Sequence, residues 1–132
     1  MIYFEDDIIS IQYNEAHELV YTEWRDFANS EEYRSILNLY LQLVQEKSVT
    51  RWIGNNTKAK AIRPADQEWT AREWALQFAQ AGQVRRMAVV VAEDIFNKMA
   101  VENMFIQSAG LIPFDTRYFQ NVPDAEAWVL EV

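Results

Sequence analysis

Few residues in this sequence could do chemistry, and they lie far apart. His17 is the only histidine among the 132 residues, and there is no cysteine. Because a serine nucleophile needs a general base beside it, a catalytic triad would depend entirely on His17. His17 lies in a polar stretch between two predicted strands, which favours a solvated turn residue. The lack of cysteine also excludes disulfides, thiolate catalysis and cysteine-ligated zinc.

A second group with chemical potential is a set of carboxylates in the middle of the chain. Asp66, Glu68 and Glu73 could perform general acid–base catalysis or bind a hard metal ion. Arg63 and Arg72 are the expected counter-charges, so we favour an ion-pair network at the surface. No glycine-rich phosphate motif or metal-loop spacing accompanies these residues. The sequence therefore predicts no cofactor and no metal site.

The longest connection without clear periodicity runs between Trp52 and Trp69. It follows a predicted strand, and ligands of α/β proteins gather at the carboxyl ends of strands. Long connections of this kind are often functional. We therefore expect a binding surface over residues 55–74. Its candidate residues are Asn55, Asn56, Thr57, Arg63, Trp69 and Trp74.

Each of these candidates also has a purely structural interpretation. Arg63, with two nearby lysines, could receive an anionic group, but a solvated loop surface is the preferred alternative. Asn55 and Asn56 could simply shape a turn. Trp69 and Trp74 could supply apolar contact to a ligand or belong to the core; Trp69 is the best single candidate because it ends the long connection.

The overall composition is that of one packed, acidic domain over residues 1–132. Half of the residues are hydrophobic, and 20 acidic against 12 basic side chains give a net charge of −8. A field of that sign repels phosphate groups, so we expect neither nucleic-acid binding nor attachment to anionic membranes. The amino terminus lacks signal-peptide features, and the longest strongly apolar run, residues 87–92, is too short to span a bilayer. We expect a cytoplasmic protein without membrane insertion.

Hydrophobic periodicity indicates alternating strands and helices. Period-two patterns predict a leading β-hairpin, and period-3.6 patterns with caps at Asn29 or Ser30, at Thr70 and at Asp94 predict helices. Thr70 and Glu73 fit a capping box, and Gly82 fits a helix C-terminus. The segment after Asp94 fits one helix or two helical pieces. The predicted strands are 8–13, 19–24, 49–54, 87–92 and 114–120, and a short final helix follows residue 121.

The resulting order, β-β-α-β-α-β-α-β-α, together with the closing segment from Ala125 to Leu130, resembles the SpoIIAA-like branch of the STAS fold. STAS domains are named for sulfate transporters and anti-sigma-factor antagonists. The resemblance implies an α/β sandwich with a leading β-hairpin, then alternating helices and mostly parallel strands of one mixed sheet. In antagonists, a phosphorylatable serine lies in a short loop that leads into the helix after the third strand. Here Asn55, Asn56 and Thr57 occupy that region, so a phosphorylation switch at Thr57 is not our preferred interpretation.

Three functions remain open at this level. The first, which the resemblance favours, is a non-catalytic regulatory module that docks a protein partner or a small amphipathic or anionic ligand. The second is a structural protein that forms a homodimer through its apolar helices. The third, and weakest, is an enzyme that uses Asp66 and Glu68.

Overall fold

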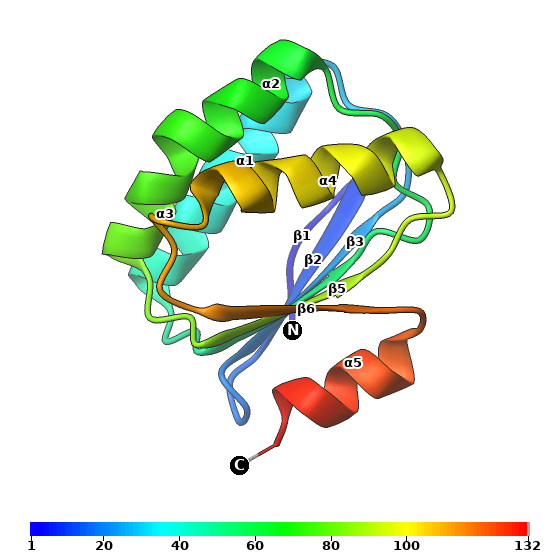
Figure 1. The fold of residues 1–132 in the computed structure, drawn as a ribbon. Helices are drawn as coiled ribbons and strands as arrows, with labels where there is room; N and C mark the ends of the chain where they lie inside the picture. The colour runs from blue at the N-terminus through cyan, green and yellow to red at the C-terminus, as the bar shows by residue number, and fades with distance from the viewer. Residues whose placement is uncertain (132) are drawn as a thin grey trace.

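A computed structural model describes residues 1–131 and contains one mixed sheet of six strands (Figure 1). The strands lie side by side in sequence order. The first three pair antiparallel, and the last four pair parallel, so β3 belongs to both arrangements. The strands are β1 (Ile2–Glu5), β2 (Ile9–Asn14), β3 (Leu19–Trp24), β4 (Arg51–Asn55), β5 (Arg86–Val90) and β6 (Asp115–Phe119).

The helices form two unequal layers on the sheet. α1 to α4 lie over one face, and α5 alone covers part of the other (Figure 1). α2, a π-helical turn η1 and α3 follow one another without a break. The bounds are α1 (Ser30–Glu46), α2 (Pro64–Trp69), η1 (Thr70–Trp74), α3 (Ala75–Ala81), α4 (Ile95–Ser108) and α5 (Val122–Val129). None of these helices is long and apolar enough to cross a membrane.

The larger core lies between the sheet and α1, and it follows from the alternation of each strand. Ile9, Ile11 and Val20 are fully buried on this face and pack with the α1 stripe that includes Leu43. The alternate residues of β5, Ala88 and Val90, pack on the other face against α5. The prediction that β5 is covered on both faces is confirmed.

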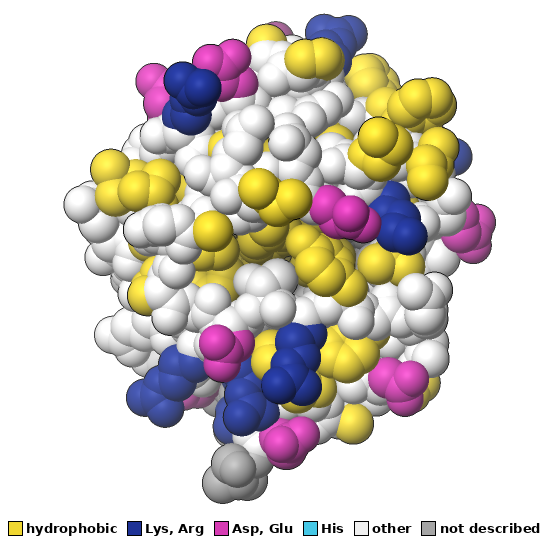
Figure 2. Space-filling view, viewed as in Figure 1, with side chains coloured by type: hydrophobic (Ala, Val, Ile, Leu, Met, Phe, Trp, Pro, Cys, Tyr) yellow, Lys and Arg dark blue, Asp and Glu magenta, His cyan; other side chains and the backbone are white. Residues whose placement is uncertain are grey.

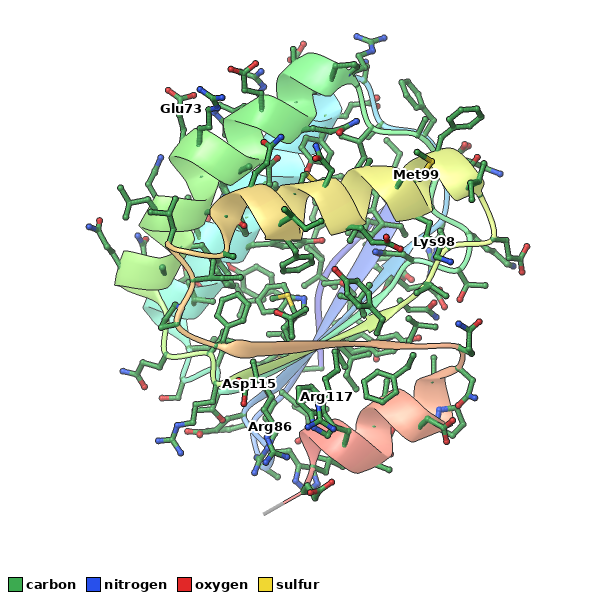
Figure 3. All side chains as sticks on the ribbon, viewed as in Figure 1. Glu73, Arg86, Lys98, Met99, Asp115 and Arg117 are labelled. Carbon is green, nitrogen blue, oxygen red and sulfur yellow. The ribbon has the colours of Figure 1, made fainter. Side chains whose placement is uncertain are left out.

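On the opposite face, arginines from two strands hold α5 in place. The guanidinium groups of Arg86 and Arg117 lie 5.3 and 5.1 Å from the centre of the Trp128 ring. Arg86 Nη1 also donates to the Trp128 carbonyl at 2.7 Å (Figure 3). Because cations at a helix C-terminus favour its dipole, this bond stabilises the end of α5.

The helix caps predicted at Asn29 and Asp94 are confirmed. Asn29 and Glu32 form a reciprocal capping box at the start of α1. Asp94 Oδ1 accepts from the backbone N–H groups of Phe96 and Asn97 at 2.8 and 3.1 Å. Residues 95–108 form one helix, not two.

The capping box predicted at Thr70 is wrong, because the helix begins earlier, at Pro64. Proline suits a first helical turn, and the extended Arg63 before it is the N-cap. Thr70 therefore lies inside the helix, where its hydroxyl donates to the Asp66 carbonyl at 2.7 Å. Trp69 consequently does not end a loop.

Two smaller predictions also need correction. The sequence patterns missed β1, a short edge strand that is only half buried and has no clear alternation. Gly82 ends α3 as its C-cap, but in an extended conformation with φ −101° rather than as a left-handed residue. The remaining strand predictions agree with the structure to within two residues at each end.

Candidate ligand-binding pocket

A pocket of about 160 Å³ lies between the sheet and its larger helical layer. It exists because α4 packs mainly against η1 and α2, whereas α5 packs directly on the strands. Hydrophobic side chains gather in the recess between α4 and β6 (Figure 2). An engineered apolar cavity of about 150 Å³ is known to bind benzene. The space is therefore sufficient for one ring-sized group.

The floor of the pocket comes from strand register. Thr22, Gly54 and Val89 pair across β3, β4 and β5 and point to the same face. Gly54 has no side chain, so it leaves a gap in this row. Apart from its two chain neighbours, a Cβ added there would meet Thr22 Oγ1 at 3.7 Å and no other atom of residues 1–131 within 4 Å. A glycine inside a strand often marks a close approach by another group.

Packed aromatic rings form one end of the pocket. The Tyr40 and Trp52 rings meet edge to face at 4.9 Å, and Trp74 stacks on Phe78 at 4.7 Å. Trp74 Nε1 donates to the Leu37 carbonyl at 2.8 Å, which fixes the indole. Because each ring is held by others, this wall is rigid and mainly apolar.

A chain of hydrogen bonds runs along the helical side. The Tyr33 hydroxyl lies 2.8 Å from Thr70 Oγ1, and Thr70 donates to the Asp66 carbonyl. The Asp66 carboxylate is 1% exposed and accepts from Arg34 Nε at 2.9 Å and Ser30 Oγ at 2.8 Å. Burial raises the pKa of Tyr33 above its ordinary value. These polar groups are therefore engaged within the fold.

The pocket also contains a buried amide that the sequence patterns did not identify. Asn97, on α4, is 3% exposed, and its Nδ2 donates to the Lys60 carbonyl at 2.8 Å. Its Oδ1 is buried and has no hydrogen-bond partner within residues 1–131. The available signal was an asparagine in an otherwise apolar run, three residues after the Asp94 cap.

The structure brings two of the predicted site residues, Asn56 and Trp74, to the pocket. Asn55 and Thr57 form the turn after β4, where Thr57 Oγ1 donates to Asn55 Oδ1 at 2.6 Å. The Asn55 amide also donates to the Tyr21 hydroxyl at 2.9 Å, which fits the turn-forming interpretation.

The other two candidates do not line the pocket. The Arg63 guanidinium lies over the Phe27 ring at 5.5 Å, and Arg34 covers the Trp69 ring at 4.9 Å. Trp69 is partly buried against the main core. Arg63 is exposed on the surface.

The three carboxylates of the predicted acidic set do not form a common site. Asp66 pairs with Arg34 rather than with Arg63. Glu68 lies 3.6 Å from Arg72 in an exposed pair, and Glu73 points away from the fold (Figure 3). Residues 1–131 contain no group of three or more histidine, cysteine, aspartate or glutamate side chains that could hold a metal ion.

Comparison with known proteins agrees with this architecture. The family model described as SpoIIAA-like matches residues 19–130. The chain belongs to the SpoIIAA-like family. The match covers every strand from β3 onwards and every helix, so the predicted family and fold class are confirmed.

A solved structure shows the same SpoIIAA-like fold at low sequence identity. It is an uncharacterised protein from Shewanella loihica PV-4, with a TM-score of 0.63 and 12% identity. The alignment covers 98% of this chain and 99% of the other. No curated protein sequence matches the chain.

Proposed function

We propose that this SpoIIAA-like domain is a non-catalytic binding module that takes one small, mainly apolar molecule into the pocket beneath α4. The observation that carries the proposal is a cavity of about 160 Å³ with an aromatic end wall and a floor gap at Gly54. Pockets of this type, mainly apolar with a few polar groups, are the usual form of small-molecule sites. The pocket also reaches Asn56 at the carboxyl end of β4, where α/β proteins bind ligands.

The groups around the pocket support binding rather than catalysis. Burial raises the pKa of both Tyr33 and Tyr40, so their hydroxyls stay protonated at neutral pH and are poor bases. The charged lining residues, Asp26 and Lys60, are exposed at the margin. His17 lies in the turn between β2 and β3, and it is not among the lining residues.

A glycine substitution tests whether the pocket binds apolar molecules. In Gly54→Leu, the new side chain occupies the floor gap, and we expect toluene affinity to fall by at least about tenfold. Gly110→Leu is the matched control, because Gly110 is exposed and a Cβ there meets nothing within 4 Å. The measurement is a toluene titration followed by ¹H–¹⁵N NMR of wild type and both variants.

The expected pattern is saturable shifts at pocket residues in wild type and Gly110→Leu only. The melting temperature of Gly54→Leu should not fall, because glycine inside a strand is itself unfavourable. Equal toluene affinity in Gly54→Leu and wild type would refute the pocket as the binding site.

A second candidate function is self-association through the outer surface of α4. Four large apolar side chains on this helix are more than half exposed: Ile95 (57%), Phe96 (69%), Met99 (61%) and Ile106 (74%). Met99 points outward in Figure 3. Exposed apolar groups of this kind mark contact surfaces when they are contiguous. Sedimentation velocity should show a dimer for the wild type and a monomer for Met99→Glu. A wild-type monomer at about 100 μM, a concentration of the order at which weak dimers form, would exclude this candidate.

A further inference from the structure

We infer that the pocket selects a neutral ligand bearing a hydrogen-bond donor, such as an alcohol, a phenol or an N–H group, and that Asn97 recognises that donor. The inference rests on the proposed function and specifies its ligand class. It starts from Asn97, a pocket-lining residue whose Oδ1 has less than 1 Å² of accessible surface and no partner within residues 1–131, so that a ligand donor reaches it when neighbouring side chains shift. Leaving such a group unpaired is unfavourable, so native proteins rarely do so without a reason.

The orientation of the Asn97 amide is fixed by its neighbours. Asp94 caps α4 and holds the backbone N–H of Asn97, while Asn97 Nδ2 donates to the Lys60 carbonyl. Because the NH₂ group donates to that carbonyl, Oδ1 is the atom of the amide that has no hydrogen-bond partner within residues 1–131. Ser10 Oγ and Thr116 Oγ1 are also buried without partners in the described chain, but neither residue lines the pocket.

Three of the hydroxyls around the pocket, those of Thr70, Tyr33 and Ser108, use their hydrogens within the fold. Thr70 donates to the Asp66 carbonyl, so the hydrogen in the Tyr33–Thr70 pair comes from Tyr33. Ser108 donates to the Met104 carbonyl at 2.7 Å. What these groups can still offer a ligand is chiefly oxygen lone pairs.

The charges near the pocket also disfavour an anion. The two charged lining residues, Asp26 and Lys60, are of opposite sign. The nearby Arg34 is paired with the buried Asp66 carboxylate, and the chain as a whole carries a net charge of −8. A mainly apolar pocket in an acidic chain should bind a carboxylate ligand weakly. The anion contact expected at Arg63 is not available there, because Arg63 does not line the pocket.

Four one-ring compounds test the preference for a hydrogen-bond donor and for a neutral ligand: phenol, toluene, anisole and benzoate. Phenol and toluene have nearly the same shape, but only phenol donates a hydrogen bond. We expect phenol to bind wild type roughly tenfold more tightly than toluene or anisole, the size of effect expected for one hydrogen bond to a buried acceptor. Benzoate should bind more weakly than toluene. Affinities come from ¹H–¹⁵N NMR titrations at a pH where phenol is neutral and benzoate is ionised.

Asn97→Leu removes the acceptor while keeping a side chain that branches at the same atom. If Asn97 recognises the donor, this variant should lose the preference for phenol over toluene. If Asn97 only anchors the Lys60 segment, both affinities should change by the same factor and their ratio should stay as in wild type, which would overturn the inference. Should the variant fail to fold, the phenol-to-anisole ratio of wild type decides, because anisole keeps the oxygen and lacks the donor.

The two proposals fail in different ways. If toluene and phenol bind wild type equally, the donor selection is wrong while the apolar pocket stands. If neither compound binds, or if both bind Gly54→Leu as well as wild type, the proposed function itself is wrong. Tight binding of benzoate would refute the neutral ligand class.

Discussion

At the scale of single residues, the most constrained group outside the pocket is the Asp66 carboxylate. It is 1% exposed and is held by Arg34 and Ser30 from the first turns of α1. The pair joins α1 to α2, and α2 leads directly into the η1 turn that lines the pocket. Removing one partner of a buried pair is destabilising because it leaves a charge without compensation.

Arg34→Met should therefore lower the free energy of unfolding by about 2 kcal/mol, a value reduced because the Arg34 side chain is 40% exposed. Methionine keeps an unbranched apolar stem but removes the guanidinium that lies over Trp69. Arg72→Met is the control, since its partner Glu68 is exposed, and it should change stability by less than about 0.5 kcal/mol. Urea unfolding measures both; equal effects would contradict a special role for the Asp66 pair.

At the scale of elements, the starts of the two long helical segments show what sequence patterns can and cannot locate. The α1 start was predictable, because Asn29 and the glutamates after it form a capping signal directly before an apolar stripe. The α2 start was missed because Arg63 offers no side-chain cap and a second apparent capping box follows at Thr70. Local chemistry at Thr70 is compatible with either a cap or a helix interior, and only tertiary packing decides between them.

Two alanine substitutions compare the capping box observed at Asn29 with the one predicted at Thr70. Asn29→Ala should destabilise the protein by about 1 kcal/mol, because it removes a bond to the Glu32 N–H at 2.9 Å. Glu73→Ala should change stability by less than about 0.5 kcal/mol, since Glu73 is exposed inside a continuous helix. Thermal or urea unfolding measures both. A loss of about 1 kcal/mol in Glu73→Ala would show that a helix begins at Thr70 after all.

The pocket itself also belongs to the element scale, and sequence could place only its margin. Asn56 and Trp74 were expected near a site because they lie in the connection after β4 and at the start of the next predicted helix. Gly54 and Asn97 were not, since their importance depends on strand register and on how far α4 stands from the sheet. Local sequence patterns cannot predict that distance, because contacts with α2 and η1, rather than neighbouring residues in the sequence, determine the position of α4.

At the scale of the whole molecule, the fold class followed from the alternation of strands and helices. Neighbouring parallel strands must be joined by crossover connections, which are usually helices. The order of strands and helices along the chain therefore leaves few possible topologies. The two layers differ in packing: α5 is packed closely on β4, β5 and β6, whereas α4 packs mainly on α2 and η1 and is held away from the sheet (Figure 1). The sheet is closely covered on the face of α5, and the space for which we propose a ligand lies on the face of α4.

We propose that a small, mainly apolar molecule with one hydrogen-bond donor binds between α4 and the sheet. The most direct measurement is a crystal structure with 4-bromophenol, with the bromine located by anomalous scattering. We expect a bromine peak in the pocket beside Gly54 and Val89, with the phenol oxygen within hydrogen-bonding distance of Asn97 Oδ1. A peak only on the outer surface of α4, or no peak at saturating concentration, would contradict it.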